Sequence, residues 1–269
     1  MSTRQPHQLD SIPSTSPDTR ANVALPPLEL AAGDRVPKYY RLKEALLRII
    51  GELPAGTLLP PERVLCETYR VSRTTVRQAL QELLVEGRLY RLQGKGTFVA
   101  RPKVVQTLAL TSYTHDMQAR GLAPASRLLG ADRAPASTEV AEMLELEPHS
   151  EVLRVERLRL ADHEPMAVET LFVDGARFPR LERQLSHARS FYELLQTEYG
   201  IELGEGEETI ESALATPADA RLLGTEVGSP VLLLTRRTWD AEGRPVEFVR
   251  SLYRGDRYRF LTRLRLRDP

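Results

Sequence analysis

A helix followed directly by a short hairpin, in VSRTTVRQALQELLVEGRLYRLQGKGTFVA, restricts the fold of this chain more than any other feature. Ser72 is a natural N-cap and Gly87 a natural residue just beyond the C-terminus of the helix. Two apolar strands then flank a glycine-rich turn at residues 93–96. Apolar residues recur at helical spacing at Val76, Ala79, Leu80, Leu83 and Leu84. The stretch therefore predicts a packed helix with a hairpin behind it.

Two further helices are predicted upstream. KYYRLKEALLRIIG carries one apolar stripe at helical spacing. PPERVLCETYR begins a shorter helix, with Pro61 suited to its first position. Three helices and a two-stranded hairpin between Lys38 and Ala100 predict a winged helix-turn-helix.

The third helix leaves polar side chains free near its N-terminus, where a recognition helix enters the major groove. Arg73, Thr74 and Arg77 lie off the buried stripe, and Arg can pair with guanine there. Arg63 can reach the flanking DNA backbone, and Lys95 supplies charge at the tip of the wing. Each residue alone is also compatible with a solvated surface, so the order of the elements carries the hypothesis.

The net charge of zero conceals a marked asymmetry. Residues 35–103 carry fourteen Lys and Arg against six Asp and Glu, whereas residues 104–269 carry 21 against 27. This distribution favours a polyanion as the partner of the first part only, although an uneven solvated surface would have the same composition.

Composition and texture also predict how the chain is divided. Residues 1–34 are rich in Pro, Ser, Thr and Ala without periodicity and are expected to form a disordered tail. We expect a DNA-binding domain at 35–101, a linker at 102–108 and a second domain at 109–269, giving an α+β protein. A single cysteine, Cys66, and the lack of any apolar run of membrane-spanning length lead us to expect a cytoplasmic protein.

The second domain contains an internal repeat, in which matching positions have numbers that differ by 79. ASTEVAEMLELEPHSEVLRVERLRL aligns with TPADARLLGTEVGSPVLLLTRRTW, which matches Arg157 with Arg236. Each copy reads as a short helix, a long strand, a turn and a returning strand. Two such units predict an antiparallel sheet with approximate twofold character, covered by helices, and a pocket where the halves meet.

Several polar residues of this domain do not suit a core. Arg157 and Arg159 share a strand face, and Glu169 is on the returning strand. Ser190 and Tyr192 lie at a helix N-terminus, which favours an anion. Two arginines with a helix N-terminus favour a phosphate, and carboxylates with a tyrosine suit hydroxyl and amine groups. The hypothesis is therefore a ligand that is a phosphorylated polyol, such as an amino sugar phosphate.

Structural interpretations remain open for the same residues. Ser190 could be only a helix cap, Arg157 and Glu169 could be a cross-strand ion pair, and Arg159 could face solvent.

The first part of the chain resembles the DNA-binding domain of the GntR family of bacterial transcription regulators. LPPER, VSRTTVRQAL and QGKGTFV carry the match, which extends from Val36 to Pro102. The resemblance implies DNA contacts at Arg63, Ser72, Arg73, Thr74, Thr75, Arg77, Gln93, Gly94 and Lys95.

The remainder resembles the UTRA effector-binding domain of the HutC subfamily, whose fold is like that of chorismate lyase. The motifs are LTSYTHDMQARG, ERLRLADHEPMAVE, SFYELL, EETIE and PVEFVRSLYRGDRYRF. The likeness is strongest to repressors of amino-sugar uptake and catabolism, which respond to glucosamine 6-phosphate or N-acetylglucosamine 6-phosphate. It implies ligand contacts at Arg157, Arg159, Glu169, Ser190, Tyr192, Glu247 and Tyr253, with Tyr113 and Thr114 at the phosphate end.

The resemblance implies a regulator that binds a palindromic operator on double-stranded DNA as a homodimer and needs no cofactor. A regulator sensing another metabolite, a DNA-binding scaffold with a vestigial pocket, and a lyase-like enzyme are the alternatives. The enzyme is disfavoured because no lysine follows Lys103 for Schiff-base chemistry, and the histidines lack metal-ligand spacing.

Overall fold

The computed structural model describes residues 36–92, 94–185 and 190–264. The expected tail at 1–34 and the wing residue Gln93 lie outside them. The chain divides into two compact units, one comprising residues up to 84 with 88–101, and the other comprising 102–269 with 85–87. Each unit is described by itself below. No helix among the described residues is both long and apolar enough to cross a membrane.

The first unit is a winged helix-turn-helix, as the sequence predicts. Its elements are α1 (Lys38–Glu52), α2 (Glu62–Tyr69), α3 (Arg73–Val85), β1 (Leu89–Leu92) and β2 (Gly96–Val99). Ser72 caps α3 by accepting the Thr75 backbone N–H at 3.1 Å. The two strands pair antiparallel and form the wing.

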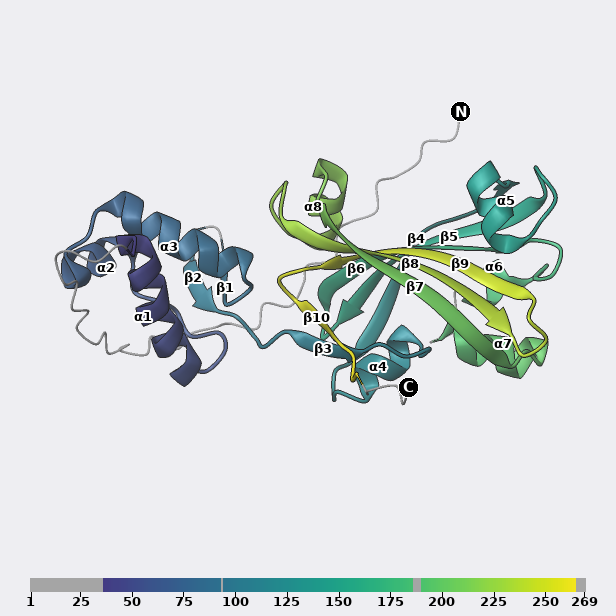
Figure 1. The fold of residues 1–269 in the computed structure, drawn as a ribbon, viewed down its shortest axis with the longest axis horizontal. Coiled ribbons are helices and arrows are strands. Elements are labelled where there is room, and N and C mark those ends of the chain that lie inside the picture. Colours follow the sequence, from purple (N-terminus) through teal and green to yellow (C-terminus); the bar gives the residue numbers. More distant parts are fainter. Residues whose placement is uncertain (1–35, 93, 186–189, 265–269) are drawn as a thin grey trace, which may run out of the picture. The chain divides into compact units, whose positions relative to one another are not determined.

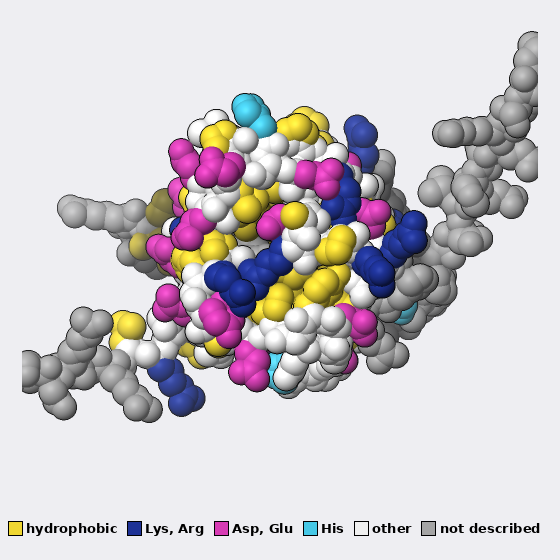
Figure 2. Space-filling model, turned by 90° about the vertical axis from the view of Figure 1, so that its right-hand side faces the viewer, with side chains coloured by type: hydrophobic (Ala, Val, Ile, Leu, Met, Phe, Trp, Pro, Cys, Tyr) yellow, Lys and Arg dark blue, Asp and Glu magenta, His cyan; other side chains and the backbone are white. Residues whose placement is uncertain are grey.

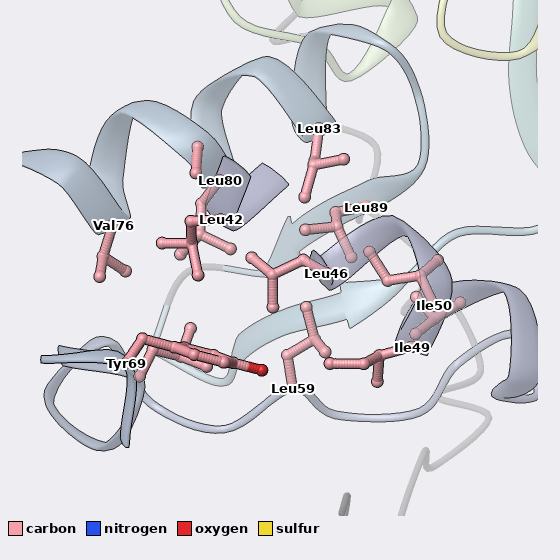
Figure 3. Packing of buried hydrophobic residues seen from close by; sticks show 13 residues of the cluster. Leu42, Leu46, Ile49, Ile50, Leu59, Tyr69, Val76, Leu80, Leu83 and Leu89 are labelled. Atoms are coloured by element: carbon pink, nitrogen blue, oxygen red, sulfur yellow. The ribbon is translucent and has the colours of Figure 1, made fainter. Parts of the chain in front are cut away.

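Apolar side chains from all three helices meet under the wing and form one core (Figure 3). Leu42 and Leu46 of α1 and Leu83 of α3 are fully buried there. Tyr69, from the end of α2, closes one side of this cluster. The packing holds α3 by one face, so its opposite face remains exposed.

The second unit is built on a six-stranded antiparallel sheet in the order β4-β5-β6-β9-β8-β7 (Figure 1). The bounds of its strands are β4 (Pro124–Pro135), β5 (Glu151–Ala161), β6 (Glu164–Asp174), β7 (Leu203–Leu214), β8 (Pro230–Asp240) and β9 (Pro245–Arg254). The central pair is β6 with β9, and β4 and β7 form the two edges. The sheet therefore consists of two three-stranded halves that meet at β6 and β9.

The internal repeat governs this arrangement and is longer than the sequence comparison indicated. The bounds of β4, of α5 (Thr138–Leu144) and of β5 become those of β7, α8 (Pro217–Leu223) and β8 when 79 is added to each number. The edge strands, which share little sequence, thus belong to the repeat as well. The predicted approximate twofold sheet is present.

Helices cover both faces of the sheet (Figure 1). On one face, α5 packs against Val152 and Phe248, and α8 packs against Leu158 and Val231. The other face carries α6 (Leu181–Leu185) and α7 (Phe191–Tyr199) over one apolar cluster, and α4 (Tyr113–Gln118) over a second. The space between these two clusters is where a site can form.

The segment expected to be a linker, 102–108, is in large part a strand. β3 (Val104–Thr107) pairs in parallel with β10 (Tyr258–Leu261) in a separate two-stranded sheet. The pairing joins the beginning of the second unit to its end, so the local pattern at 102–108 could not reveal it. The ordered second unit therefore begins earlier than residue 109.

Candidate functional site

The predicted DNA contacts at the start of α3 lie together on its exposed side. Ser72, Arg73, Thr74 and Arg77 are exposed or nearly so, and Thr75 is half-buried beneath them. The Ser72 hydroxyl also lies 2.8 Å from Thr75 Oγ1, which fixes the first turn of the helix.

The other predicted DNA contacts lie on α2 and the wing. Arg63 is exposed and pairs with Glu67 one turn along α2 at 3.1 Å. Gly94 and Lys95 form the exposed turn between β1 and β2, and Gly94 has a φ of +73°, which favours glycine. Apart from the half-buried Thr75, the predicted DNA contacts on the described α2, α3 and wing residues lie on accessible surface.

Glu62 connects α2 to the recognition helix. Its Oε2 accepts a hydrogen bond from Arg77 Nε at 2.9 Å, and its Oε1 lies 4.0 Å from Arg91 Nη2 on the wing. The hydrogen bond from Arg77 to Glu62 raises the pKa of the guanidinium. This acid holds Arg77 in position without using the side chain's other donors.

No continuous basic surface is visible on the face of the second unit drawn in Figure 2, at the end that carries α5, α6 and α7. Basic, acidic and apolar side chains are interspersed there. The sequence locates the basic excess in residues 35–103 instead. A polyanion is therefore matched by the first unit.

The candidate effector site is a pocket on the α4 and α7 face of the six-stranded sheet. The empty space between its walls, including the part that is open solvent, is about 540 Å³. Arg157, Glu169 and Ser251 form one row across the neighbouring strands β5, β6 and β9 at its floor. This polar row lies between the apolar clusters under α7 and under α4. The two arginines of β5 are therefore part of a pocket floor between two cores.

Glu169 is held between the two arginines. It accepts a hydrogen bond from Arg157 Nη2, and Arg159 Nε lies 3.2 Å from its other oxygen. Burial alone would raise the pKa of Glu169, but Arg157 and Arg159 outweigh burial and lower it to about 2. The cross-strand ion pair is thus present, and it lines the pocket.

Both arginines keep a buried donor that no described group accepts. Nε of Arg157 and Nε of Arg159 have no hydrogen-bond partner among the described residues, although Arg159 Nε lies within ion-pair distance of Glu169. Burial, and then the charge of Arg159, lower the pKa of Arg157. The Tyr113 hydroxyl is likewise buried without a partner, and its ring lies 4.8 Å from the Arg159 guanidinium. These three donors belong to residues that line one pocket, where an anion would be stabilised.

A second polar group lies at the α7 side of the pocket. The Tyr192 hydroxyl donates to Glu247 Oε1 at 2.5 Å, and the Thr238 hydroxyl donates to the same oxygen at 2.9 Å. Burial raises the pKa of Glu247 and also that of Tyr192. Glu247 lines the pocket, so its carboxyl can form a hydrogen bond with a hydroxyl or amine of a ligand.

A third arginine that sequence reasoning did not select also lines the pocket. Arg236 of β8 donates from Nε to Glu208 of β7 at 2.9 Å and from Nη1 to Tyr192 at 3.4 Å. Burial would lower the pKa of Arg236, but its acidic and phenolic neighbours raise it. The repeat already aligned Arg236 with Arg157, and that alignment was the signal that could have identified it.

The structure brings most of the predicted ligand residues together. Those that line the pocket are Tyr113, Arg157, Arg159, Glu169, Tyr192, Glu247 and Tyr253. Ser190 and Thr114 are buried but lie outside the lining. Ser190 caps α7, accepting the Glu193 backbone N–H at 3.4 Å, which is the structural interpretation that the sequence left open. Arg159 is 4% exposed and does not face solvent.

Comparison with known proteins accounts for both units. A model of bacterial regulatory proteins of the gntR family matches residues 38–99, and a model of the UTRA domain matches residues 119–259. The chain belongs to the gntR family. The UTRA domain places this gntR-family regulator in the HutC subfamily, so the predicted family and α+β fold are confirmed.

Individual relatives are similar over almost their whole length. The HTH-type transcriptional repressor NagR of Bacillus subtilis is 40% identical over 230 residues, 84% of this chain and 94% of NagR. The HTH-type transcriptional repressor PhnF of Mycolicibacterium smegmatis is 35% identical over 229 residues, 85% of this chain and 93% of PhnF. The crystal structure of PhnF from Mycobacterium smegmatis superimposes with a TM-score of 0.61 at 34% identity, covering 84% of this chain and all of PhnF.

The gntR-family regulator therefore binds DNA through its first unit and a small-molecule effector through its second. It is a transcription regulator and not an enzyme. Among the described residues, no three His, Cys, Asp or Glu side chains are grouped so that they could hold a metal ion.

Proposed function

We propose that this regulator is a repressor of genes for amino-sugar uptake and catabolism, and that its effector is a phosphorylated amino sugar. The observation that carries the proposal is the set of buried, unpartnered donors on Arg157, Arg159 and Tyr113 in one pocket. Charge-assisted hydrogen bonds from guanidinium groups are well suited to a phosphate.

The rest of the pocket supports a polyol with an amine. Glu169 and Glu247 can accept hydrogen bonds from hydroxyl or ammonium groups, and Tyr253 lies on the same strand face as Ser251. Similarity to NagR at 40% identity supports the same class of regulator.

The protein would act as a homodimer in the cytoplasm, and each subunit would contribute one DNA-binding unit. Two such units would occupy the half-sites of a palindromic operator, with Arg73, Thr74 and Arg77 reading bases in the major groove. The contacts to DNA would further include Ser72, Thr75, Arg63, Gln93, Gly94 and Lys95. Effector binding changes operator affinity only if the effector binds the DNA-competent and DNA-incompetent states with different affinities.

Operator binding in the presence of the effector tests this function. The purified protein is titrated onto its operator in a gel-shift assay, with and without glucosamine 6-phosphate. We expect the sugar phosphate to change the affinity of the wild type for the operator. The Arg157→Ala protein should bind the operator as the wild type does, but its operator affinity should change little when the sugar phosphate is added. Arg183→Ala, on α6 outside the pocket lining, is the control and should respond as the wild type does.

Two results would contradict the proposal. A wild-type protein that binds its operator but responds to no phosphorylated sugar would refute the effector class. An Arg157→Ala protein that folds and responds fully would refute the role of the arginines.

A further inference from the structure

Gln106 is a buried polar residue of the pocket that neither the motifs nor the repeat identified. It lies on β3, is 4% exposed and lines the pocket beside Ser112 and Tyr113 at the start of α4. Its Oε1 is buried and has no hydrogen-bond partner among the described residues. A buried amide oxygen without a partner is costly, so a group that supplies the missing hydrogen bond is stabilised there.

The orientation of the amide follows from its other neighbour. Gln106 Nε2 donates to Asp116 Oδ2 at 2.8 Å, and the Thr111 hydroxyl donates to the same oxygen at 2.8 Å. A carboxylate accepts hydrogen bonds, so the nitrogen of the amide must point to Asp116. The oxygen is therefore the atom of this amide that remains without a partner, in a residue that lines the pocket.

Contacts with β10 and α4 position the strand that carries Gln106. The backbone of Gln106 lies beside Phe260 of β10, and Arg120 donates from Nε to the carbonyl of Val105 at 2.8 Å. Arg120 Nη1 also lies 3.6 Å from Asp116, so α4 and β3 are joined through one polar network. A side chain that is fixed in this way can discriminate between ligands.

We propose that Gln106 accepts a hydrogen bond from a hydroxyl or amine group of the effector, and so ties the effector to β3. This inference rests on the proposed function and adds a specificity element to it. An amide oxygen repels a phosphate and accepts a hydrogen bond from a hydroxyl or amine. Gln106 therefore recognises the sugar end of the ligand, while the arginines recognise the phosphate. β3 begins shortly after β2 ends in the sequence. The hydrogen bond to Gln106 therefore links the effector to the chain segment that directly follows the DNA-binding unit.

Calorimetric titrations of the full-length protein test the contact. Gln106→Leu removes the acceptor, and Gln118→Leu, on an exposed position of α4, is the matched control. We expect Gln106→Leu to lower the affinity for glucosamine 6-phosphate by about three- to tenfold, which is the contribution of one hydrogen bond. The affinity for inorganic phosphate should not change. At saturating glucosamine 6-phosphate, the gel-shift response of the Gln106→Leu protein should be smaller than that of the wild type.

Ligand analogues provide the same test without relying on the variant's stability. Among the monodeoxy analogues of glucosamine 6-phosphate, one should lose affinity for the wild type and bind Gln106→Leu no worse than the parent does. Equal affinity of wild type and variant for the parent and for every analogue would overturn the contact. An undiminished operator response of the variant at saturation would overturn the tie to β3. A wild-type protein that binds neither glucosamine 6-phosphate nor inorganic phosphate would instead refute the proposed function.

Discussion

Glu169→Gln removes the counter-charge from two buried arginines and should have two opposite effects. It leaves Arg157 and Arg159 buried without a negative partner, which lowers the free energy of unfolding of the second unit. It also removes the internal competitor for any anion at the arginines. The variant should therefore be less stable alone and should gain more stability from phosphate than the wild type does.

The size of the first effect follows from the depressed pKa of Glu169. A carboxyl with a pKa of about 2 in the folded protein and about 4.3 in the unfolded chain contributes roughly 3 kcal/mol at neutral pH. Because the folded pKa is the lower one, this stability is present above about pH 4 and is lost as the pH falls toward 2. In Glu169→Gln this part of the acid dependence should be absent.

The second effect is set by mass action. A ligand at a hundred times its dissociation constant stabilises the folded state by about 2.7 kcal/mol, so phosphate can restore most of the loss. Arg157 and Arg159 supply the Nε donors that such an anion would use.

Urea unfolding followed by tryptophan fluorescence measures both effects. Trp239 is the single tryptophan of the chain and lies on β8, so its signal reports the second unit. The unfolding is repeated in phosphate and in chloride of equal ionic strength, and Glu211→Gln, exposed on β7, is the control. A Glu169→Gln protein as stable as the wild type, or one that phosphate stabilises no more than chloride does, would refute the reasoning.

Two further substitutions separate the chemistry of the two units. Arg73→Ala should cost about 1–3 kcal/mol of operator binding and relax the preference at one base pair, measured by gel shift on single-base operator variants, without changing effector affinity. Glu247→Gln should raise the stability of the folded protein at neutral pH. Burial raises the pKa of Glu247, so the wild type loses stability as the pH rises through that pKa. The amide of the variant does not ionise, and its oxygen still accepts hydrogen bonds from Tyr192 and Thr238. Urea unfolding between about pH 4 and pH 8 checks this, and a wild type and variant with parallel profiles would contradict it.

The helices and the repeat were predictable because their signals are local. The periodic apolar residues of α3 and the Ser72 cap determine that helix almost by themselves. The constant offset between the two copies matched β5 with β8 and led to a twofold sheet with a pocket. Arg157, Arg159 and Glu169 were selected because charged side chains at core positions conflict with the strand pattern.

The missed residues depend on contacts between distant parts of the chain. Gln106 lies on a strand that exists only because β10, the last strand of the chain's described residues, pairs with it. Glu208 belongs to edge strand β7, whose exposed, acidic sequence gives no core signal. For Ser190, the sequence left open a helix cap and a ligand contact, and the structure shows that its hydroxyl caps α7. Side-chain direction, which the local sequence does not carry, decides between such roles.

Direct titration of the wild-type protein with glucosamine 6-phosphate and with glucosamine tests the central claim, which is that the buried arginines bind the phosphate of an amino-sugar effector. The account predicts one site per chain for the phosphate, a much weaker signal for glucosamine, and loss of the site in Arg157→Ala. Binding of equal strength for both sugars, or full binding by a folded Arg157→Ala protein, would contradict it.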